Sequence, residues 1–209
     1  MAAYHSGRRL ASAITVFVGL RLALYVVSIG LWWTISDRQD VDTVALIESG
    51  GSILYVIGAI LFLIWVHGAT RNLAALGSES IRISPSDAVW GYLIPLVNLV
   101  RGHQVMANLW TESQPTAAPE PGIYVPGRTT LVNLWWGLHL FGGFVSIVYR
   151  SAHTLAALST RFVVLDTIFL ASGVCFLWVV RAVQSRQDEQ WKDIRLRNAV
   201  PAPTADVLR

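Results

Sequence analysis

Four long apolar runs constrain this 209-residue chain more than any other feature of its sequence. They cover residues 11–35, 50–67, 131–149 and 162–183, and each approaches the roughly 20 residues with which an α-helix crosses a bilayer. Charged residues make up only 14% of the chain, against about 25% in soluble domains. The sequence therefore predicts an all-α polytopic membrane protein with four transmembrane helices. This excludes a disordered chain, a coiled coil and most soluble enzymes.

We interpret the whole chain, 1–209, as a single membrane domain. Between the second and third runs lie a broken segment at 85–113 and a Pro- and Gly-rich linker at 114–130, and a tail at 184–209 follows the fourth run. Arg8 and Arg9 precede the first run as they would in a signal peptide, but the run is too long for a cleaved one. We therefore expect it to remain as the first transmembrane helix.

The distribution of basic residues predicts the orientation in the membrane. With the N-terminus inside, the inner segments hold twelve Lys and Arg residues and the outer loops hold three. Because cytoplasmic loops are enriched in these residues, we expect a multi-pass protein of the bacterial plasma membrane with both termini in the cytoplasm. The first outer loop would then carry Asp40, Asp42 and Glu48. The net charge of +3 reflects the inner basic residues, so nucleic acid is not an expected partner.

The segment at 85–113 reads as two helices separated by a proline. Ser84 and Pro85 suit a helix start, and an apolar stretch at 88–100 follows, interrupted by Pro95. Its thirteen residues reach only about 20 Å, which is too short to cross the bilayer. The next residues are amphipathic. The sequence predicts a Pro-broken helix pair that is either interfacial or re-entrant, because a fifth span would place Arg101 and its polar neighbours in lipid.

A series of short motifs runs through residues 50–190. It has the form W…RN…SP…W…IPxxNLxR…QVM..LW and comprises Trp65, Arg71, Asn72, Ser84, Pro85, Trp90, the string 94–101, Gln104, Val105, Met106, Leu109 and Trp110, with Trp135, Trp136, Arg181, Arg186 and Gln187 further along. These motifs resemble a bacterial family of four-span membrane proteins known only as a domain of unknown function. Gly102 and His67 depart from the family pattern, which usually has proline and arginine near these positions. The resemblance implies the four-span topology and transfers no catalytic residue.

Polar residues around the broken segment form the main candidate site. All of them should lie at the inner interface, where they could hold a phosphate or an anionic lipid headgroup; they are Arg71, Asn72, Asn98, Arg101, His103, Gln104 and Asn108. The favoured interpretation is nevertheless that Asn98 caps the second half-helix, bracing the break, while Arg101 touches bulk lipid.

Three ionisable residues fall inside the predicted spans. Arg21 could bind an anion or pair within the bundle, although we favour a side chain that extends to the inner headgroups. His139 could be a metal ligand or a proton-linked switch, although a neutral, hydrogen-bonded imidazole is favoured. Asp166 could pair with Arg161 or Arg150 or act in a proton relay, although a helix-start carboxylate is favoured.

No pattern indicates catalysis or a bound cofactor. Cys175 is the only cysteine, metal-binding histidine spacings are absent, and no nucleophile–base pair or phosphate loop can be recognised. We therefore predict no metal, no cofactor and no catalytic residue. The favoured hypothesis is a non-enzymatic sensor, scaffold or accessory subunit that engages lipid or a partner at its cytoplasmic face. The expected partners are membrane lipid and a second copy or another membrane protein. The alternatives are a small oligomeric transporter or channel, and a lipid-modifying enzyme.

Overall fold

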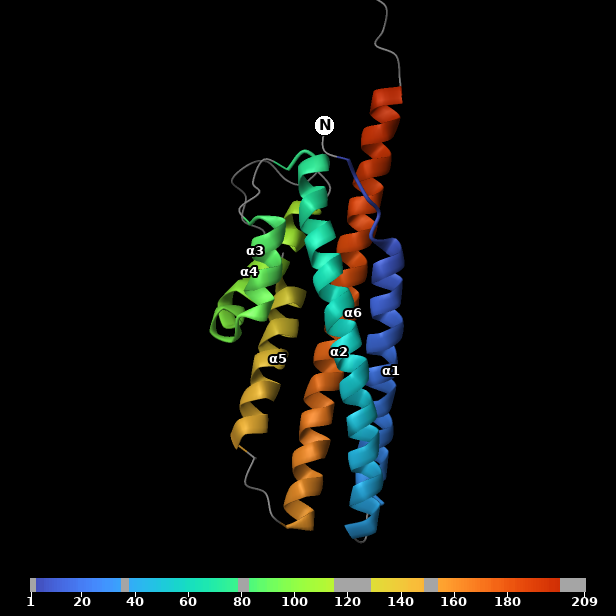
Figure 1. The fold of residues 1–209 in the computed structure, drawn as a ribbon, viewed down its shortest axis with the longest axis vertical. Helices are drawn as coiled ribbons and strands as arrows, with labels where there is room; N and C mark the ends of the chain where they lie inside the picture. The colour runs from blue at the N-terminus through green and yellow to red at the C-terminus, as the bar shows by residue number, and fades with distance from the viewer. Residues whose placement is uncertain (1–2, 35–37, 79–82, 115–128, 149–153, 200–209) are drawn as a thin grey trace, which may run out of the picture.

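The computed structural model describes residues 3–34, 38–78, 83–114, 129–148 and 154–199. These residues form six α-helices and no strand (Figure 1). In chain order the helices are α1 (Arg8–Trp32), α2 (Arg38–Ala75), α3 (Pro85–Leu93), α4 (Pro95–Glu112), α5 (Thr130–Val148) and α6 (Leu155–Ala199). The predicted all-α class with a Pro-broken helix pair is confirmed.

Four of these helices, α1, α2, α5 and α6, are long and apolar enough to cross a membrane. In Figure 1 they run along one axis, with α1 at the right-hand edge and α5 at the left. α1 packs against both α2 and α6, and α5 packs against α6. Stacked aromatic rings fix the antiparallel register of α1 and α6, because Trp32 lies 5.1 Å from Phe162 and Tyr25 lies 6.3 Å from Phe169. The protein is a multi-pass membrane protein.

Two helices extend well beyond the predicted spans. α6 has 45 residues and is therefore about 68 Å long, more than twice the thickness of the hydrocarbon core. Its last turns, residues 184–199, lie beside the N-terminal segment 3–7, and we call this end of the bundle the terminal end. α2 starts at Arg38, so Asp42 and Glu48 belong to a helix. Their assignment to an outer loop was wrong, because the polar residues before the second apolar run continue its helix.

The helices α3 and α4 form a helical hairpin. The Ser84 hydroxyl accepts a hydrogen bond from the amide of Asp87, which starts α3, and the chain turns at Ile94 before Pro95 starts α4. α4 then runs antiparallel to α5, since His103 contacts Asn133 and the Trp136 indole donates to the Leu99 carbonyl. This register places the turn near the middle of α5. The sequence left an interfacial placement open, and the packing of α4 favours the re-entrant one.

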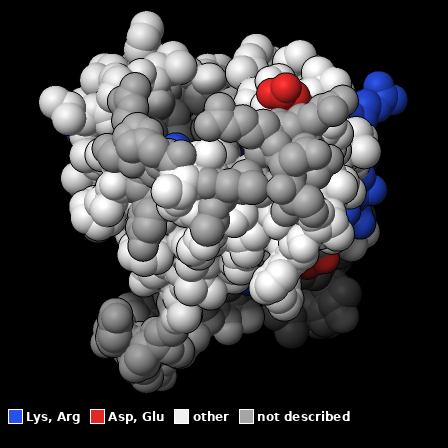
Figure 2. Space-filling model, turned by 90° about the horizontal axis from the view of Figure 1, so that it is seen from below, with Lys and Arg blue, Asp and Glu red and all other residues white. Residues whose placement is uncertain are grey.

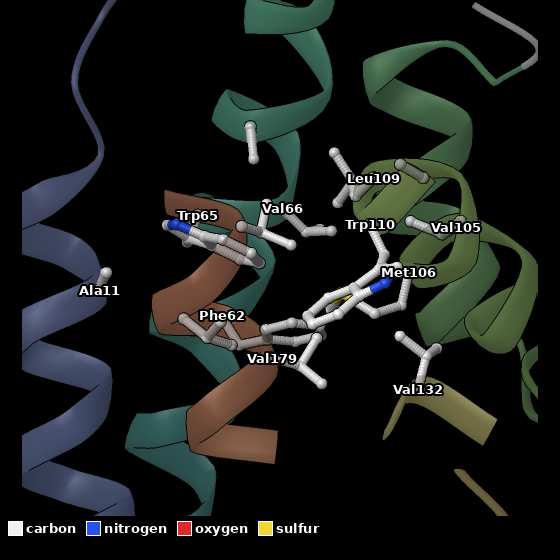
Figure 3. Close-up of a cluster of buried hydrophobic side chains, with 14 of the residues drawn as sticks. Ala11, Phe62, Trp65, Val66, Val105, Met106, Leu109, Trp110, Val132 and Val179 are labelled. Atoms are coloured by element: carbon white, nitrogen blue, oxygen red, sulfur yellow. The ribbon is translucent and has the colours of Figure 1, made fainter. Parts of the chain in front are cut away.

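The hydrophobic core lies in the half of the bundle nearest the terminal end (Figure 3). α4 inserts the side chains of Val105, Met106 and Leu109 between α2, α5 and α6, and each of the three is at most 1% exposed. Val179 of α6 and Trp65 of α2 belong to the same core; Trp65 lies on its α1 side, where the indole donates to Gln184. The apolar face of the second half of α4 thus packs on protein, whereas Leu96, Leu99 and Val100 in its first turns remain exposed.

The predicted linker at 114–130 and the end of the predicted tail lie largely outside the described residues.

Candidate intramembrane binding site

A cavity of about 410 Å³ lies inside the bundle, below the tip of the re-entrant hairpin. All six helices contribute to its lining. The hairpin fills the space between α2 and α5 in the terminal half, because α3 packs on α2 and α4 packs on α5. α2 and α5 themselves do not pack extensively on each other. The side between α2 and α5, beyond the hairpin tip, is therefore the lateral opening of the cavity toward the bilayer.

The lining of the cavity is mainly apolar and aromatic. Rings come from five helices and contact one another at the edges of the space, as shown by Phe62 against Phe176 at 5.2 Å and Trp135 against Trp136 at 5.2 Å. Such surfaces favour hydrocarbon chains and planar rings. The residues with polar side chains in the lining are Arg21, Tyr25, Tyr55, Tyr92, Asn98, His139 and Ser172.

Arg21 forms an ion pair inside the bundle. Its Nη2 atom lies 3.0 Å from Oε2 of Glu48, and its guanidinium carbon lies 4.3 Å above the ring of Tyr25. Tyr25 is one turn closer to the far end of α1, so the side chain points away from the terminal end. The favoured reading of Arg21 as a residue extending to the inner headgroups was therefore wrong. Gly51 allows this path, because a Cβ atom there would overlap the guanidinium.

His139 and Asn98 face the same cavity from α5 and α4. The imidazole of His139 stacks on Trp136 at 5.6 Å and has no hydrogen-bond partner among the described residues. The Oδ1 atom of Asn98 is buried and likewise unpartnered within the described part of the chain. Asn98 thus does not brace the break as expected. Instead, the hydroxyl of Tyr92 joins the two helices on either side of the break by donating to the Gly102 carbonyl at 2.7 Å, and the Trp136 indole donates to the Leu99 carbonyl.

Asp166 is 3% exposed and lies on the face of α6 that packs on α1. Its Oδ2 atom is buried and has no hydrogen-bond partner among the described residues. It forms no salt bridge among the described residues, so the suggested pair with Arg161 is absent there. Asp166 does not line the cavity.

The predicted cluster at the inner interface separates into three places. Asn98 enters the cavity, and Asn72 is 1% exposed with its amide bonded to both the N–H and the carbonyl of His5. Asn72 is therefore occupied by protein and is not free to hold an anion. The remaining members lie at the surface. Arg71 is on α2. The others border a groove of about 570 Å³ on the outer side of α4; they are Arg101, His103, Gln104 and Asn108.

A polar network that the sequence did not predict holds the terminal end together. Asp188, on α6 beyond the apolar span, accepts hydrogen bonds from Tyr4, Ser6 and Gln184, and its other oxygen pairs with Arg8 at 3.1 Å. Burial alone would raise the pKa of Asp188, but the hydrogen bonds from Tyr4, Ser6 and Arg8 outweigh it and hold the pKa below its ordinary value. The network therefore fixes residues 3–7 against α6.

Charge is unevenly distributed between the two ends. Viewed from the end opposite the terminal end, the described surface is mostly uncharged, with few acidic and basic side chains (Figure 2). The basic residues of α4 and of the α6 extension lie toward the terminal end. Among the described residues no group of three or more His, Cys, Asp or Glu side chains could hold a metal ion.

Comparison with known proteins gives a family and no individual relative. A family model described as a domain of unknown function (DUF4328) matches residues 33–185, which include the hairpin, α2, α5 and most of α6 but not α1, the helix that carries Arg21 and Tyr25 of the cavity. No curated protein and no solved structure matches the chain.

Proposed function

Because this chain belongs to the DUF4328 family, a domain family with no assigned function, we propose a role from its own geometry: it is a non-enzymatic membrane protein that binds one lipid molecule. The lipid enters the cavity sideways between α2 and α5. The protein acts as a sensor or accessory subunit that reports lipid occupancy to the terminal end. This end faces the bacterial cytoplasm, as the distribution of basic residues predicts.

The laterally open cavity is the observation that carries this proposal. Its volume of about 410 Å³ falls within the range of roughly 300–1,000 Å³ typical of small-molecule sites. Its lining combines aromatic walls with a small number of polar side chains, the combination that holds an amphipathic molecule in one orientation. An opening toward hydrocarbon selects a ligand that is already dissolved in the bilayer.

The same residues give less support to the two alternatives. A transporter needs a polar path along the bundle, whereas aromatic rings dominate the cavity and Asp166 lies outside it. An enzyme needs a nucleophile beside an acid or base. Ser172, the hydroxyl residue of α6 in the cavity, bonds to the carbonyl of Trp135 and to no base among the described residues.

Native mass spectrometry of the full-length protein, released from membranes in mild detergent, tests the proposal. The parent should retain one lipid per chain. Ala59→Phe places a ring inside the cavity and should abolish retention, whereas Ala74→Phe, the same change on an exposed surface of α2, should not. Equal retention in both variants, or no retained lipid in the parent, would overturn the proposal.

A further inference from the structure

We propose that the occupant of this cavity is a prenyl lipid with a neutral, carbonyl-bearing ring, that is, a quinone. This inference rests on the proposed lipid-binding function and names the chemistry of the ligand. Three features of the cavity carry it, namely its charge, its depth and its hydrogen-bonding groups.

The charge of the cavity favours a neutral ligand. Arg21 is the cation that lines it, and the carboxylate of Glu48 already neutralises this cation at 3.0 Å. A phosphate or carboxylate headgroup would lose its hydration without gaining an unpaired cation in return. Burial of such an ion costs several kcal/mol. A neutral ring avoids this cost.

The depth of the cavity excludes ordinary phospholipid headgroups. Arg21 lies thirteen residues from the start of α1 and eleven from its end, so it is about 20 Å and 16 Å of helix from the two ends. Phospholipid headgroups remain at the interfaces, and the re-entrant hairpin covers the cavity on the terminal side. A polar ring at this depth must belong to a lipid that can lie wholly within the hydrocarbon.

The hydrogen-bonding groups suit a ring with carbonyls on opposite sides. His139 offers an imidazole that has no partner among the described residues, and the Nε and Nη1 atoms of Arg21, also without a partner there, lie buried in the wall of the cavity beneath its surface. They come from α1 and α5, which lie diagonally across the four spanning helices. Each can donate to a carbonyl oxygen, since arginine only donates and a neutral imidazole carries one N–H.

Aromatic rings beside these donors provide stacking surfaces for a planar head. Phe169 lies 6.4 Å from His139 and 6.3 Å from Tyr25, so the rings of three helices surround the same space. The prenyl tail would leave between α2 and α5, past Leu54 and Tyr55.

Binding is tested with the full-length protein in nanodiscs of defined phospholipid. A quinone with four prenyl units is titrated while tryptophan fluorescence is followed, because Trp135 and Trp136 line the cavity. Geranylgeraniol, a prenyl alcohol without carbonyls, serves as the matched ligand. In the Ala59→Phe variant the added ring fills the cavity. The quenching that remains in this variant therefore comes from quinone dissolved in the bilayer and is the background of the titration.

We expect saturable quinone quenching in the parent that Ala59→Phe lacks, and competition by geranylgeraniol only at ten or more times the quinone concentration. His139→Phe keeps an aromatic ring but removes a donor, so it should weaken quinone binding about tenfold and leave the weak binding of geranylgeraniol unchanged. The control His67→Phe, at an exposed position, should bind quinone as the parent does.

The inference is overturned if geranylgeraniol competes as well as quinone, or if His139→Phe binds quinone normally. Lipid retention in native mass spectrometry without saturable quinone binding would refute the quinone and keep the proposed function. Loss of both signals would refute both.

Discussion

The ion pair between Arg21 and Glu48 makes an asymmetric prediction about its two halves. Both side chains are mostly buried, with 12% and 21% of their surface exposed. In Arg21→Leu the remaining carboxylate can take up a proton and become neutral. In Glu48→Gln the remaining guanidinium cannot lose its proton, because arginine stays charged in proteins. We therefore expect Glu48→Gln to be the more damaging change.

The expected loss of stability in Arg21→Leu, the less damaging of the two changes, follows from the acidity of glutamate. Protonating a carboxylate of ordinary solution acidity at pH 7 costs about 4 kcal/mol, and at pH 5 about 1 kcal/mol. At pH 7 Arg21→Leu should therefore lose at most about 4 kcal/mol of stability, or roughly 10 °C in melting temperature for a domain of this size. Most of this loss should disappear at pH 5. Glu48→Gln should lose more, with little recovery at acidic pH.

Thermal melting in one detergent at pH 7 and pH 5 measures these differences. The double variant Arg21→Met with Glu48→Leu removes both charges, and it should melt close to the parent because no unpaired ion remains. Arg21→Lys keeps the charge and should recover much of the stability at both pH values. The reasoning fails if Arg21→Leu melts like the parent at pH 7, or if the double variant is as unstable as Glu48→Gln.

Four further predictions follow from other parts of the structure. Gly102→Ala should destabilise the protein by about 1–3 kcal/mol in melting experiments, because a Cβ atom would lie 2.6 Å from both Trp136 and Asn98, whereas Gly137→Ala meets no atom within 4 Å and should be neutral. Asp188 has a lowered pKa, so its contribution to stability is complete above the unfolded pKa near 3.9 and is lost as the pH falls through the folded value. Asp188→Asn removes this contribution and should therefore expose residues 3–7 to proteolysis at neutral pH. Unchanged proteolysis would contradict this prediction. In a Cys175→Ala background, Gln39→Cys should react with an impermeant thiol reagent from outside the cell and Lys192→Cys only after permeabilisation, with the opposite pattern reversing the topology. Arg101→Gln should leave the melting temperature unchanged but reduce co-purified anionic lipid, because Arg101 is exposed on the polar side of α4; equal lipid content would remove the evidence for a headgroup contact there.

Local signals were sufficient to predict the hairpin but not its depth. Ser84 and Pro85 start a helix through capping and backbone geometry, and Pro95 cannot continue one, so both helices could be placed from neighbouring residues alone. The apolar side chains of Val105, Met106 and Leu109 would suit a lipid surface and a protein core equally well. Only contact with α2, α5 and α6 shows that they fill a core.

The candidate site shows the same limit more strongly. Arg21, His139 and Asn98 could each be identified from the sequence as polar residues in apolar surroundings, but their common cavity could not, because they come from different helices. Glu48 was missed, since an acidic residue before an apolar run is typical of a loop as well as of a helix start. The length of α2 and the space over Gly51 were needed to bring it to Arg21.

The sequence by itself therefore determined the helices, the membrane and the position of the break, because hydrophobic length, proline geometry and capping act over a few neighbouring residues. The tertiary structure decided which polar groups meet, that the hairpin enters the bundle, and that the side between α2 and α5 stays open. These features depend on how helices far apart in the chain pack against one another. Among apolar helices many such arrangements bury similar areas, so only specific contacts, such as Trp32 on Phe162 and Arg21 on Glu48, select one.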